Sequence, residues 1–368
     1  MRNIVLCCDG TSNEFCTDNT NGVKLYQMLK KHPDEQLYFY DPGVGTFASP
    51  GALLPVSKRV TRVLGLAIGL GLMTNVQEAY QYLMNHWRPG DEIYIFGFSR
   101  GAYTARAVAA MVHRCGLLEP GQEQLVPYAS RVFRSVAKQD WSVSRDFNGT
   151  FGRPVKVRFL GLWDTVSSVG WAWDPESLPF TRNNADVETV RHAVAIDERR
   201  AFFRQNLWAE GGDVKQVWFA GVHCDVGGSY PPDRSGLSQI TLEWMVAEAD
   251  LAGLKIDQQK RRRVLSSPPP DHAAPASESL AGFCKVAEYY PKRVNKKVTA
   301  LDRTTKWKTF HRMNRSRCRT IPEGSLIHES VFKRMEHVPS YRPTNLPAHY
   351  AIEQPRQTAN DTTFARPP

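Results

Sequence analysis

Six short runs of apolar and β-branched residues recur along the sequence, and most of them are almost continuous in hydrophobicity. The runs are Asn3–Cys8, Gln36–Tyr40, Glu92–Gly97, Val155–Trp163, Val190–Ile196 and Gln216–Val222. A strand with one solvent-exposed face alternates polar and apolar residues, whereas a continuous apolar run indicates a strand that is buried on both faces of a parallel sheet. Helical patterns lie between the runs, most clearly over Thr61–Trp87 and Ala102–Cys115. This alternation predicts an α/β fold with a mostly parallel sheet and helices on both of its faces.

The pattern changes after Pro231. A further helix is expected over Ser238–Leu254, and Ser266–Ser279 has the proline and serine content of a loop. We interpret residues 255–349 as a basic, irregular extension that decorates the sheet of a core formed by residues 1–254. The expected organisation is one domain of residues 1–349, followed by a disordered tail over residues 350–368.

The positive charge is concentrated in that extension. The chain carries a net charge of +10, and residues 255–319 hold 17 Lys and Arg against 5 Asp and Glu, an excess of 12, so the remainder sums to −2. Such a segment attracts an anionic membrane surface, nucleic acid or an acidic protein, unless it is only a solvated basic face. No nucleic-acid-binding motif accompanies it, so we do not expect nucleic acid as the partner.

Other patterns bear on location. The seven cysteines are scattered without a C-x-x-C pair, which favours reduced thiols and indicates neither a disulfide framework nor a zinc ribbon. The N-terminal apolar run is too short for a secretory signal, and no run reaches transmembrane length. We expect a cytoplasmic protein, leaving open export without a signal peptide and peripheral contact with a membrane.

The apolar stretch Val60–Met73 has two alternative interpretations. It is either a lid or lipid-facing element, or a buried helix.

The pentapeptide Gly97–Gly101 matches G-x-S-x-G, with Ser99 at its centre. In a nucleophile elbow the serine occupies a strained turn between a strand and a helix, and small flanking residues are needed where the backbones crowd. Here the motif follows a strand-like run and precedes a helical one, which is the required context. The alternative is a serine in an ordinary glycine turn. We predict that Ser99 is a catalytic nucleophile.

A serine hydroxyl needs a base, and the base needs an orienting carboxylate. Two of the apolar runs end at suitable residues, Asp164 and His223, where active sites of parallel sheets gather. The order Ser99, Asp164, His223 is that of α/β-hydrolases. Asp197 remains an alternative acid and His328 a rival base, whereas Asp225 reads as a turn-forming or supporting residue.

The tetrahedral intermediate of such a reaction needs backbone N–H donors. The amide of Arg100 opens the helix after Ser99, and Gly10 or Thr11 follows the first apolar run, where the second donor is expected. The alternative is a simple turn in which Asp9 caps local amides. No metal or other cofactor is required, and the glycine loop Asp41–Thr46 lacks the lysine of a phosphate-binding P-loop.

Several motifs together resemble the uncharacterised α/β-hydrolase family that includes the phospholipase effectors of type VI secretion. They are Cys8–Thr11, Tyr40–Thr46, Gly97–Ala102, Gly161–Val166, Asp197–Arg200, Trp218–Gly228 and Tyr341–Pro343. The resemblance extends from about Arg2 to Pro347. It implies a serine phospholipase with a Ser-Asp-His triad on Ser99, Asp164 and His223, and a secretion or immunity partner.

From the residues and the resemblance we expect a serine ester hydrolase that works through an acyl-enzyme. A glycerophospholipid is the expected substrate, with the basic segment favouring anionic headgroups. Two alternatives stay open. One is a general carboxylesterase acting on soluble esters, and the other is a basic binding module with a vestigial active site.

Overall fold

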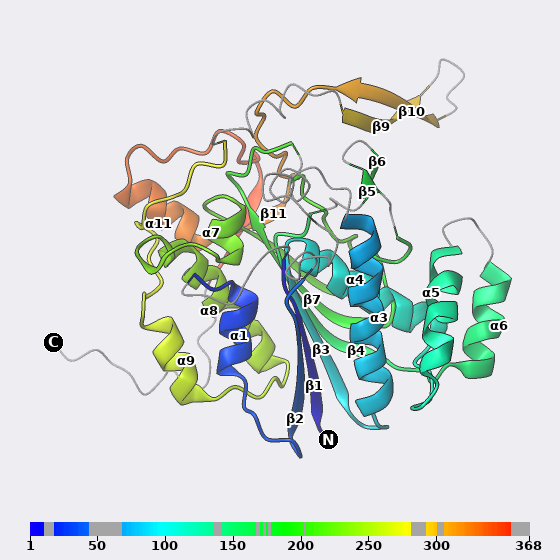
Figure 1. Cartoon of the computed structure of the whole chain (residues 1–368). Helices are drawn as coiled ribbons and strands as arrows, with labels where there is room; N and C mark the ends of the chain where they lie inside the picture. The colour runs from blue at the N-terminus through cyan, green and yellow to red at the C-terminus, as the bar shows by residue number, and fades with distance from the viewer. Residues whose placement is uncertain are drawn as a thin grey trace, which may run out of the picture.

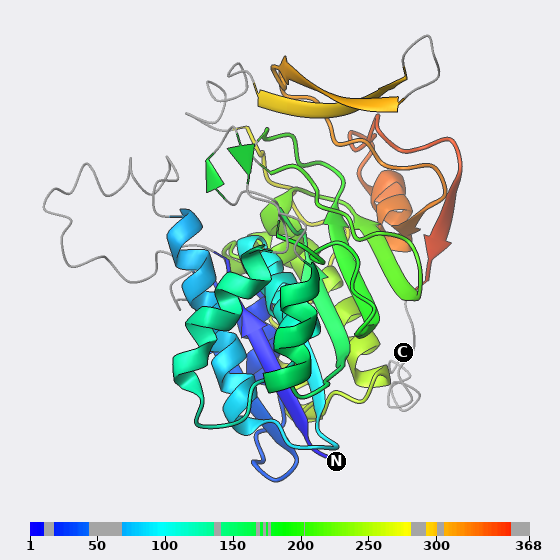
Figure 2. The same ribbon diagram turned by 90° about the vertical axis from the view of Figure 1, so that its right-hand side faces the viewer.

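An eight-stranded parallel sheet forms the centre of the protein, as a computed structural model shows (Figures 1 and 2). The structure describes residues 1–10, 18–43, 68–135, 141–166, 170–171, 174–175, 178–201, 203–280, 292–299 and 305–354. The strand order is β12-β11-β8-β7-β4-β3-β1-β2, and every pair of neighbours is parallel. The strands are β1 Asn3–Cys8, β2 Gln36–Asp41, β3 Glu92–Phe98, β4 Val157–Trp163, β7 Val187–Ala195, β8 Asp213–Phe219, β11 Ser325–His328 and β12 Tyr350–Glu353. The predicted α/β class is confirmed, and each of the six predicted strands is present to within three residues at either end.

Helices cover both faces of the sheet, and the side chains of β1 show why. Ile4, Leu6 and Cys8 pack into one core cluster, together with residues of α3 (Ile68–His86), α4 (Arg100–Cys115) and α5 (Val126–Ser135). Val5 and Cys7 point the other way into a second cluster with α1 (Asn21–Met28) and α8 (Gly236–Leu251). Because successive residues of a strand face opposite sides, burial of both sets explains the continuous apolar runs. Within the described ranges, the other helices of eight or more residues are α6 Trp141–Phe151, α9 Gln258–Leu265 and α11 Glu329–His337.

The strand order places a topological switch point between β1 and β3. From β1 the chain adds β2 on one side, and from β3 it adds β4, β7 and β8 on the other. In open α/β sheets, ligands bind outside the carboxyl ends of the strands at such a point. The residues after β1 and β3, which include Gly10 and Ser99, therefore lie where this architecture places a site.

The C-terminal third departs from the prediction in two places. β11 and β12 add two parallel strands to the edge of the main sheet beyond β8, so the extension is part of the sheet and not only a decoration. β12 also lies within residues 350–368, so the predicted disordered tail is wrong for Tyr350–Glu353. Each of these strands has only four residues, too few for a hydrophobic period to be recognised, and main-chain pairing to an existing edge holds them.

Other parts of the extension form a separate antiparallel hairpin. Its strands are β9 (Lys292–Thr299) and β10 (Thr305–Arg312), and both views place it beyond the carboxyl ends of the main strands (Figures 1 and 2). Two short strands, β5 (Gly170–Trp171) and β6 (Asp174–Pro175), pair on the same side of the molecule.

The apolar stretch Val60–Met73 is only partly within the described residues. Residues 60–67 lie outside them, and residues 68–73 open α3. Leu72 is 2% exposed and packs in the core cluster beside α4, as the buried-helix alternative predicts for that residue. Within the described ranges, no helix combines the length and the apolar character that crossing a bilayer demands.

Candidate active site

Ser99 occupies a sharp turn between β3 and α4. Its backbone angles are φ 61° and ψ −120°, a region that non-glycine residues rarely adopt. A Cβ on Gly97 would lie 2.5 Å from the carbonyl oxygen of Gly101, and a Cβ on Gly101 would lie 2.3 Å from that of Cys8. Both glycines are therefore required by close backbone approach, and the turn has the geometry expected of a nucleophile elbow.

Three predicted residues meet at this turn. The hydroxyl oxygen of Ser99 lies 2.8 Å from Nε2 of His223, and Nδ1 of His223 lies 2.5 Å from Oδ2 of Asp164. All three are buried, with exposed fractions of 8%, 2% and 0% in that order. The three side chains lie at the ends of β3 and β4 and at the start of α7 (His223–Gly227), which follows β8. This is the hydrogen-bonded chain that links a nucleophile to a base and the base to its carboxylate.

Asp164 accepts hydrogen bonds from several donors in addition to His223. It follows β4 at φ 40°, and its Oδ1 accepts a hydrogen bond of 2.9 Å from the backbone N–H of Ala195. The guanidinium of Arg319 binds both carboxylate oxygens, with Nη1 at 2.5 Å from Oδ1 and Nη2 at 3.0 Å from Oδ2. Burial alone would raise the pKa of Asp164, but the charge of Arg319 and the hydrogen bond to His223 outweigh it. The pKa of Asp164 therefore lies well below its ordinary value, and the carboxylate is ionised.

Arg319 is the main residue of the site that the sequence did not reveal. The residue is 6% exposed, and its side chain also donates to the backbone carbonyls of Ala195, at 3.0 Å, and Phe203. It belongs to the basic segment 255–319, where it counts only as one of 17 cations. No local pattern marks it, because its partner lies 155 residues earlier in the chain.

The imidazole of His223 lies in an apolar setting. The rings of Phe98 and Phe203 lie 4.8 Å and 4.7 Å from it, measured between ring centres. Burial lowers the pKa of His223, and this effect outweighs the opposing influence of Asp164 and of the buried Glu198. The backbone N–H of His223 donates to Oε2 of Glu198 at 3.2 Å. His223 is therefore held neutral near pH 7, as a proton acceptor must be.

The alternative acid and base take other places. Asp197 accepts hydrogen bonds from the Gly221 amide at 2.6 Å and the Tyr341 hydroxyl at 2.9 Å, and burial raises its pKa to about 6. His328 ends β11 and caps the N-terminus of α11, with Nδ1 accepting from the Ser330 amide at 3.3 Å. β11 has only four residues and includes His328 itself, so His328 lies at the end of a strand that was not predicted. Neither residue is bonded to Ser99 or His223 in the described part of the chain.

Asp225, read from the sequence as a supporting residue, caps a turn. Its Oδ2 accepts hydrogen bonds from the backbone amides of Val222, at 2.9 Å, and Ser277, at 3.2 Å. It thereby fixes the start of α7, on which His223 is the first residue.

The backbone amides predicted as oxyanion donors differ in whether they already have a hydrogen-bond acceptor. Arg100 is the first residue of α4, where a backbone N–H has no acceptor within the helix. The N–H of Gly10 donates to Oδ1 of Asp9 at 2.7 Å, so in this structure it serves the alternative, local turn. Oδ2 of Asp9 is held in turn by the hydroxyls of Thr20 at 2.5 Å and Tyr40 at 2.8 Å. Thr11 lies outside the described residues.

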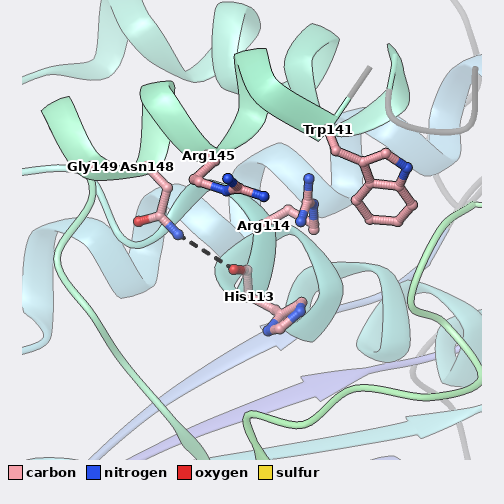
Figure 3. A pocket seen from close by; sticks show the side chains of 6 residues that line it. All are labelled: His113, Arg114, Trp141, Arg145, Asn148 and Gly149. Atoms are coloured by element: carbon pink, nitrogen blue, oxygen red, sulfur yellow. Dashed lines mark hydrogen bonds between the residues drawn. The ribbon is translucent and has the colours of Figure 1, made fainter. Parts of the chain in front are cut away.

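One hollow borders the site, and another lies well away from it. One of about 290 Å³ borders the triad through Phe203 and Arg319. The other, of about 330 Å³, lies between the C-terminal end of α4 and α6 and is lined by Arg114, Trp141 and Arg145 among others (Figure 3). Arg114 is 15 residues after Ser99 on the same helix, which places it roughly 22 Å away at 1.5 Å per residue. The second hollow is thus separate from the elbow.

The parallel sheet, the elbow and the switch point define an α/β protein of α/β-hydrolase-like architecture. Within that class, the chain belongs to the family described as T6SS phospholipase effector Tle1-like, catalytic domain, whose sequence model matches residues 2–248. This confirms the family resemblance drawn from the motifs. Arg319, β11 and β12 lie beyond the matched residues.

Individual relatives are similar over parts of their length. The chain is 38% identical over 221 residues to the uncharacterized protein YEL023C of Saccharomyces cerevisiae, a match that covers 55% of this chain and 32% of that protein. The chain thus spans about a third of the yeast relative. Among solved structures, an uncharacterized protein from Pseudomonas aeruginosa has a TM-score of 0.45 at 19% identity, covering 74% of this chain and 49% of that one. The Tle1 effector bound to the VgrG spike of the type 6 secretion system has a TM-score of 0.35 at 18% identity, covering 85% and 69%.

Proposed function

We propose that this protein is a serine ester hydrolase of the phospholipase type, with Ser99 as nucleophile, His223 as general base and Asp164 as the residue that orients His223. One observation carries the proposal: the bonded chain from the Ser99 hydroxyl through His223 to Asp164, built on a strained elbow at the carboxyl end of the sheet. The family to which the chain belongs supports a lipid ester as the substrate.

The geometry supports a two-step reaction. Nε2 of His223 takes the Ser99 proton while the serine oxygen attacks the acyl carbonyl carbon. The tetrahedral intermediate collapses by expelling the alcohol, which receives that proton from His223, and an acyl-serine ester remains. Water then attacks this ester while His223 accepts a proton from it, and the second tetrahedral intermediate collapses. His223 returns the proton to the Ser99 oxygen as the bond to the acyl group breaks and the fatty acid leaves. Asp164 stays ionised throughout and stabilises the imidazolium that forms.

The oxyanion would be held by the amide of Arg100 and by a second amide from the loop after β1. The backbone of this loop lies directly against Gly101, which supports its role. If Gly10 is the donor, its N–H must turn from the Asp9 carboxylate to the substrate oxygen when substrate binds. Asp164, and not Asp197, is proposed as the triad acid because the carboxylate of Asp164 is hydrogen-bonded to the imidazole of His223, whereas Asp197 accepts from the Gly221 amide.

The charge of the extension supports action at an anionic lipid surface. The two strands of the hairpin, β9 and β10, carry seven Lys and Arg residues and no Asp or Glu. The hairpin lies beyond the carboxyl ends of the main strands (Figure 1), the edge of the sheet at which Ser99 follows β3. Basic segments near an anionic membrane gain about 1 kcal/mol for each Lys or Arg close to the surface. We also propose a component of a type VI secretion system as a partner, on the strength of the family alone.

A test compares the wild type with Ser99→Ala on defined phospholipid vesicles, with and without anionic lipid, by analysis of the released products. The wild type should release fatty acid, faster on anionic vesicles, and Ser99→Ala should lose activity by several orders of magnitude. A fluorophosphonate probe should label the wild type at Ser99 and leave Ser99→Ala unlabelled. Turnover retained by a correctly folded Ser99→Ala variant would refute the assignment.

A further inference from the structure

The hollow beside the triad is built from two segments that are far apart in the chain. One follows β7 and contributes residues 198–200 and 203–205, and the other precedes β11 and contributes residues 313–314 and 317–320. The cavity measures about 290 Å³, at the lower end of the range for small-molecule sites. Its size suits a headgroup more than an acyl chain.

This hollow is joined directly to the residues of the elbow. Phe203, in its wall, lies edge-on to the His223 ring with 4.7 Å between ring centres. Arg319, also in the wall, holds Asp164, and Glu198 accepts the backbone N–H of His223. A group bound in the hollow is therefore one side chain away from the general base.

The charges of the wall are strongly unbalanced. It contains the arginines Arg199, Arg200, Arg204, Arg317 and Arg319, against the single carboxylate of Glu198. Arg200 pairs with Glu198 at 2.8 Å, and Arg319 pairs with Asp164. Within the described ranges, no carboxylate pairs with Arg199 or Arg317. Arg199 donates to the backbone carbonyl of Ser316 at 2.9 Å, and both side chains belong to exposed residues.

Gathered guanidinium groups repel one another unless an anion lies between them. Arginine presents its N–H groups in a planar fork that matches the oxygens of a phosphate. In a glycerophospholipid, the phosphate is attached to the same glycerol that carries the acyl esters. An ester carbonyl at Ser99 would thus leave the phosphate close to His223, on whichever side offers it partners.

We propose that the hollow is a phosphate subsite, in which Arg199 and Arg317 bind the phosphodiester of the lipid whose acyl ester is attacked by Ser99. The inference rests on the proposed ester hydrolase activity and adds that the enzyme selects its substrate by the phosphodiester group. The other arginine-containing hollow, with Arg114 and Arg145, is too far along α4 to serve this purpose (Figure 3).

The test uses two soluble short-chain substrates with identical acyl groups, a diacyl phosphatidylcholine and the corresponding diacylglycerol, and measures the ratio of their kcat/KM values. Arg317→Ala and Arg199→Ala should each lower the phospholipid-to-diacylglycerol ratio by roughly ten- to a hundredfold, the effect of losing one charge-assisted hydrogen-bonding pair. Arg317→Lys should retain part of the preference, because lysine keeps the charge and loses the fork. Arg145→Ala removes the same charge from the distant hollow and should leave the ratio unchanged.

The outcomes separate this inference from the proposed function. If the double variant Arg199→Ala/Arg317→Ala keeps the wild-type ratio while Ser99→Ala loses both activities, the phosphate subsite is refuted and the hydrolase stands. If Ser99→Ala retains both activities, the proposed function fails first. Inorganic phosphate should compete with the phospholipid in the wild type and not in the double variant. Competition by phosphate combined with an unchanged substrate ratio would mean a site for free phosphate, which overturns the lipid assignment.

Discussion

Replacing Arg319 by methionine tests the role of the buried guanidinium that pairs with Asp164. The substitution keeps an unbranched, flexible side chain and removes the two hydrogen bonds to Asp164 and those to the carbonyls of Ala195 and Phe203. The carboxylate left behind is 0% exposed. Breaking a buried ion pair by removing one partner costs about 3–5 kcal/mol, which is a large part of the ~5–15 kcal/mol that stabilises a typical domain.

The loss should depend on pH, and its direction follows from Asp164. In the wild type the folded-state pKa of Asp164 is depressed, so its ionisation contributes stability above the ordinary Asp pKa, and this is lost as pH falls through the folded value. Without Arg319, burial raises the pKa of Asp164 towards or above its unfolded value. The destabilisation by Arg319→Met should therefore be largest near pH 7 and should shrink as Asp164 becomes protonated in acid.

Urea unfolding at several pH values measures this effect. Arg317→Met is the matched control, since Arg317 lies two residues away, is exposed and pairs with no carboxylate of the described residues, so its cost should stay within about 0.5 kcal/mol. The double variant Arg319→Met/Asp164→Asn should be more stable than the sum of the single changes predicts, because the unpaired charge is gone. Equal, pH-independent losses for Arg319→Met and Arg317→Met would refute the reasoning.

Three other predictions concern the site. Burial lowers the pKa of His223, so kcat/KM should fall on the acidic side only at a pH below about 6.5, the pKa of an ordinary histidine. A pH–rate profile in which kcat/KM falls with a midpoint above pH 6.5 would contradict this prediction. Asp164→Asn should lower kcat about 10⁴-fold, as for other triads, whereas Asp197→Asn should cost far less; the reverse order in steady-state kinetics would exchange the acid. Gly101→Ala places a Cβ 2.3 Å from the carbonyl oxygen of Cys8 and should therefore abolish activity and lower Tm. The control is Gly149→Ala in α6, where a Cβ meets nothing within 4 Å, and this variant should leave Tm unchanged or raise it.

The sequence was most informative about strands whose side chains are buried on both faces of the sheet. β1, β3 and β4 are buried on both faces, so their continuous hydrophobicity predicted them. Parallel strands end at one edge of the sheet, which is why residues following separate strands, Ser99, Asp164 and His223, could be predicted to meet.

The features that escaped prediction depend on contacts between distant segments or on single backbone torsions. Arg319 has no periodic neighbours, and only the folded chain brings it to Asp164. β12 has four residues and gains its structure from the edge that β11 provides. The direction of the Gly10 amide is decided by the carboxylate of Asp9, a contact that a sequence pattern cannot distinguish from an open oxyanion donor.

The position of Arg319 in the chain also sets an order of events during synthesis. Ser99, Asp164 and His223 emerge from the ribosome first, and Arg319 follows 96 residues after His223. At about 5–20 residues per second, that delay is roughly 5–20 s. During this interval Asp164 lacks the two guanidinium hydrogen bonds that hold its carboxylate in the folded protein. The arrangement of Ser99, His223 and Asp164 with its counter-charge is therefore complete only once residues of the C-terminal third have folded onto the sheet.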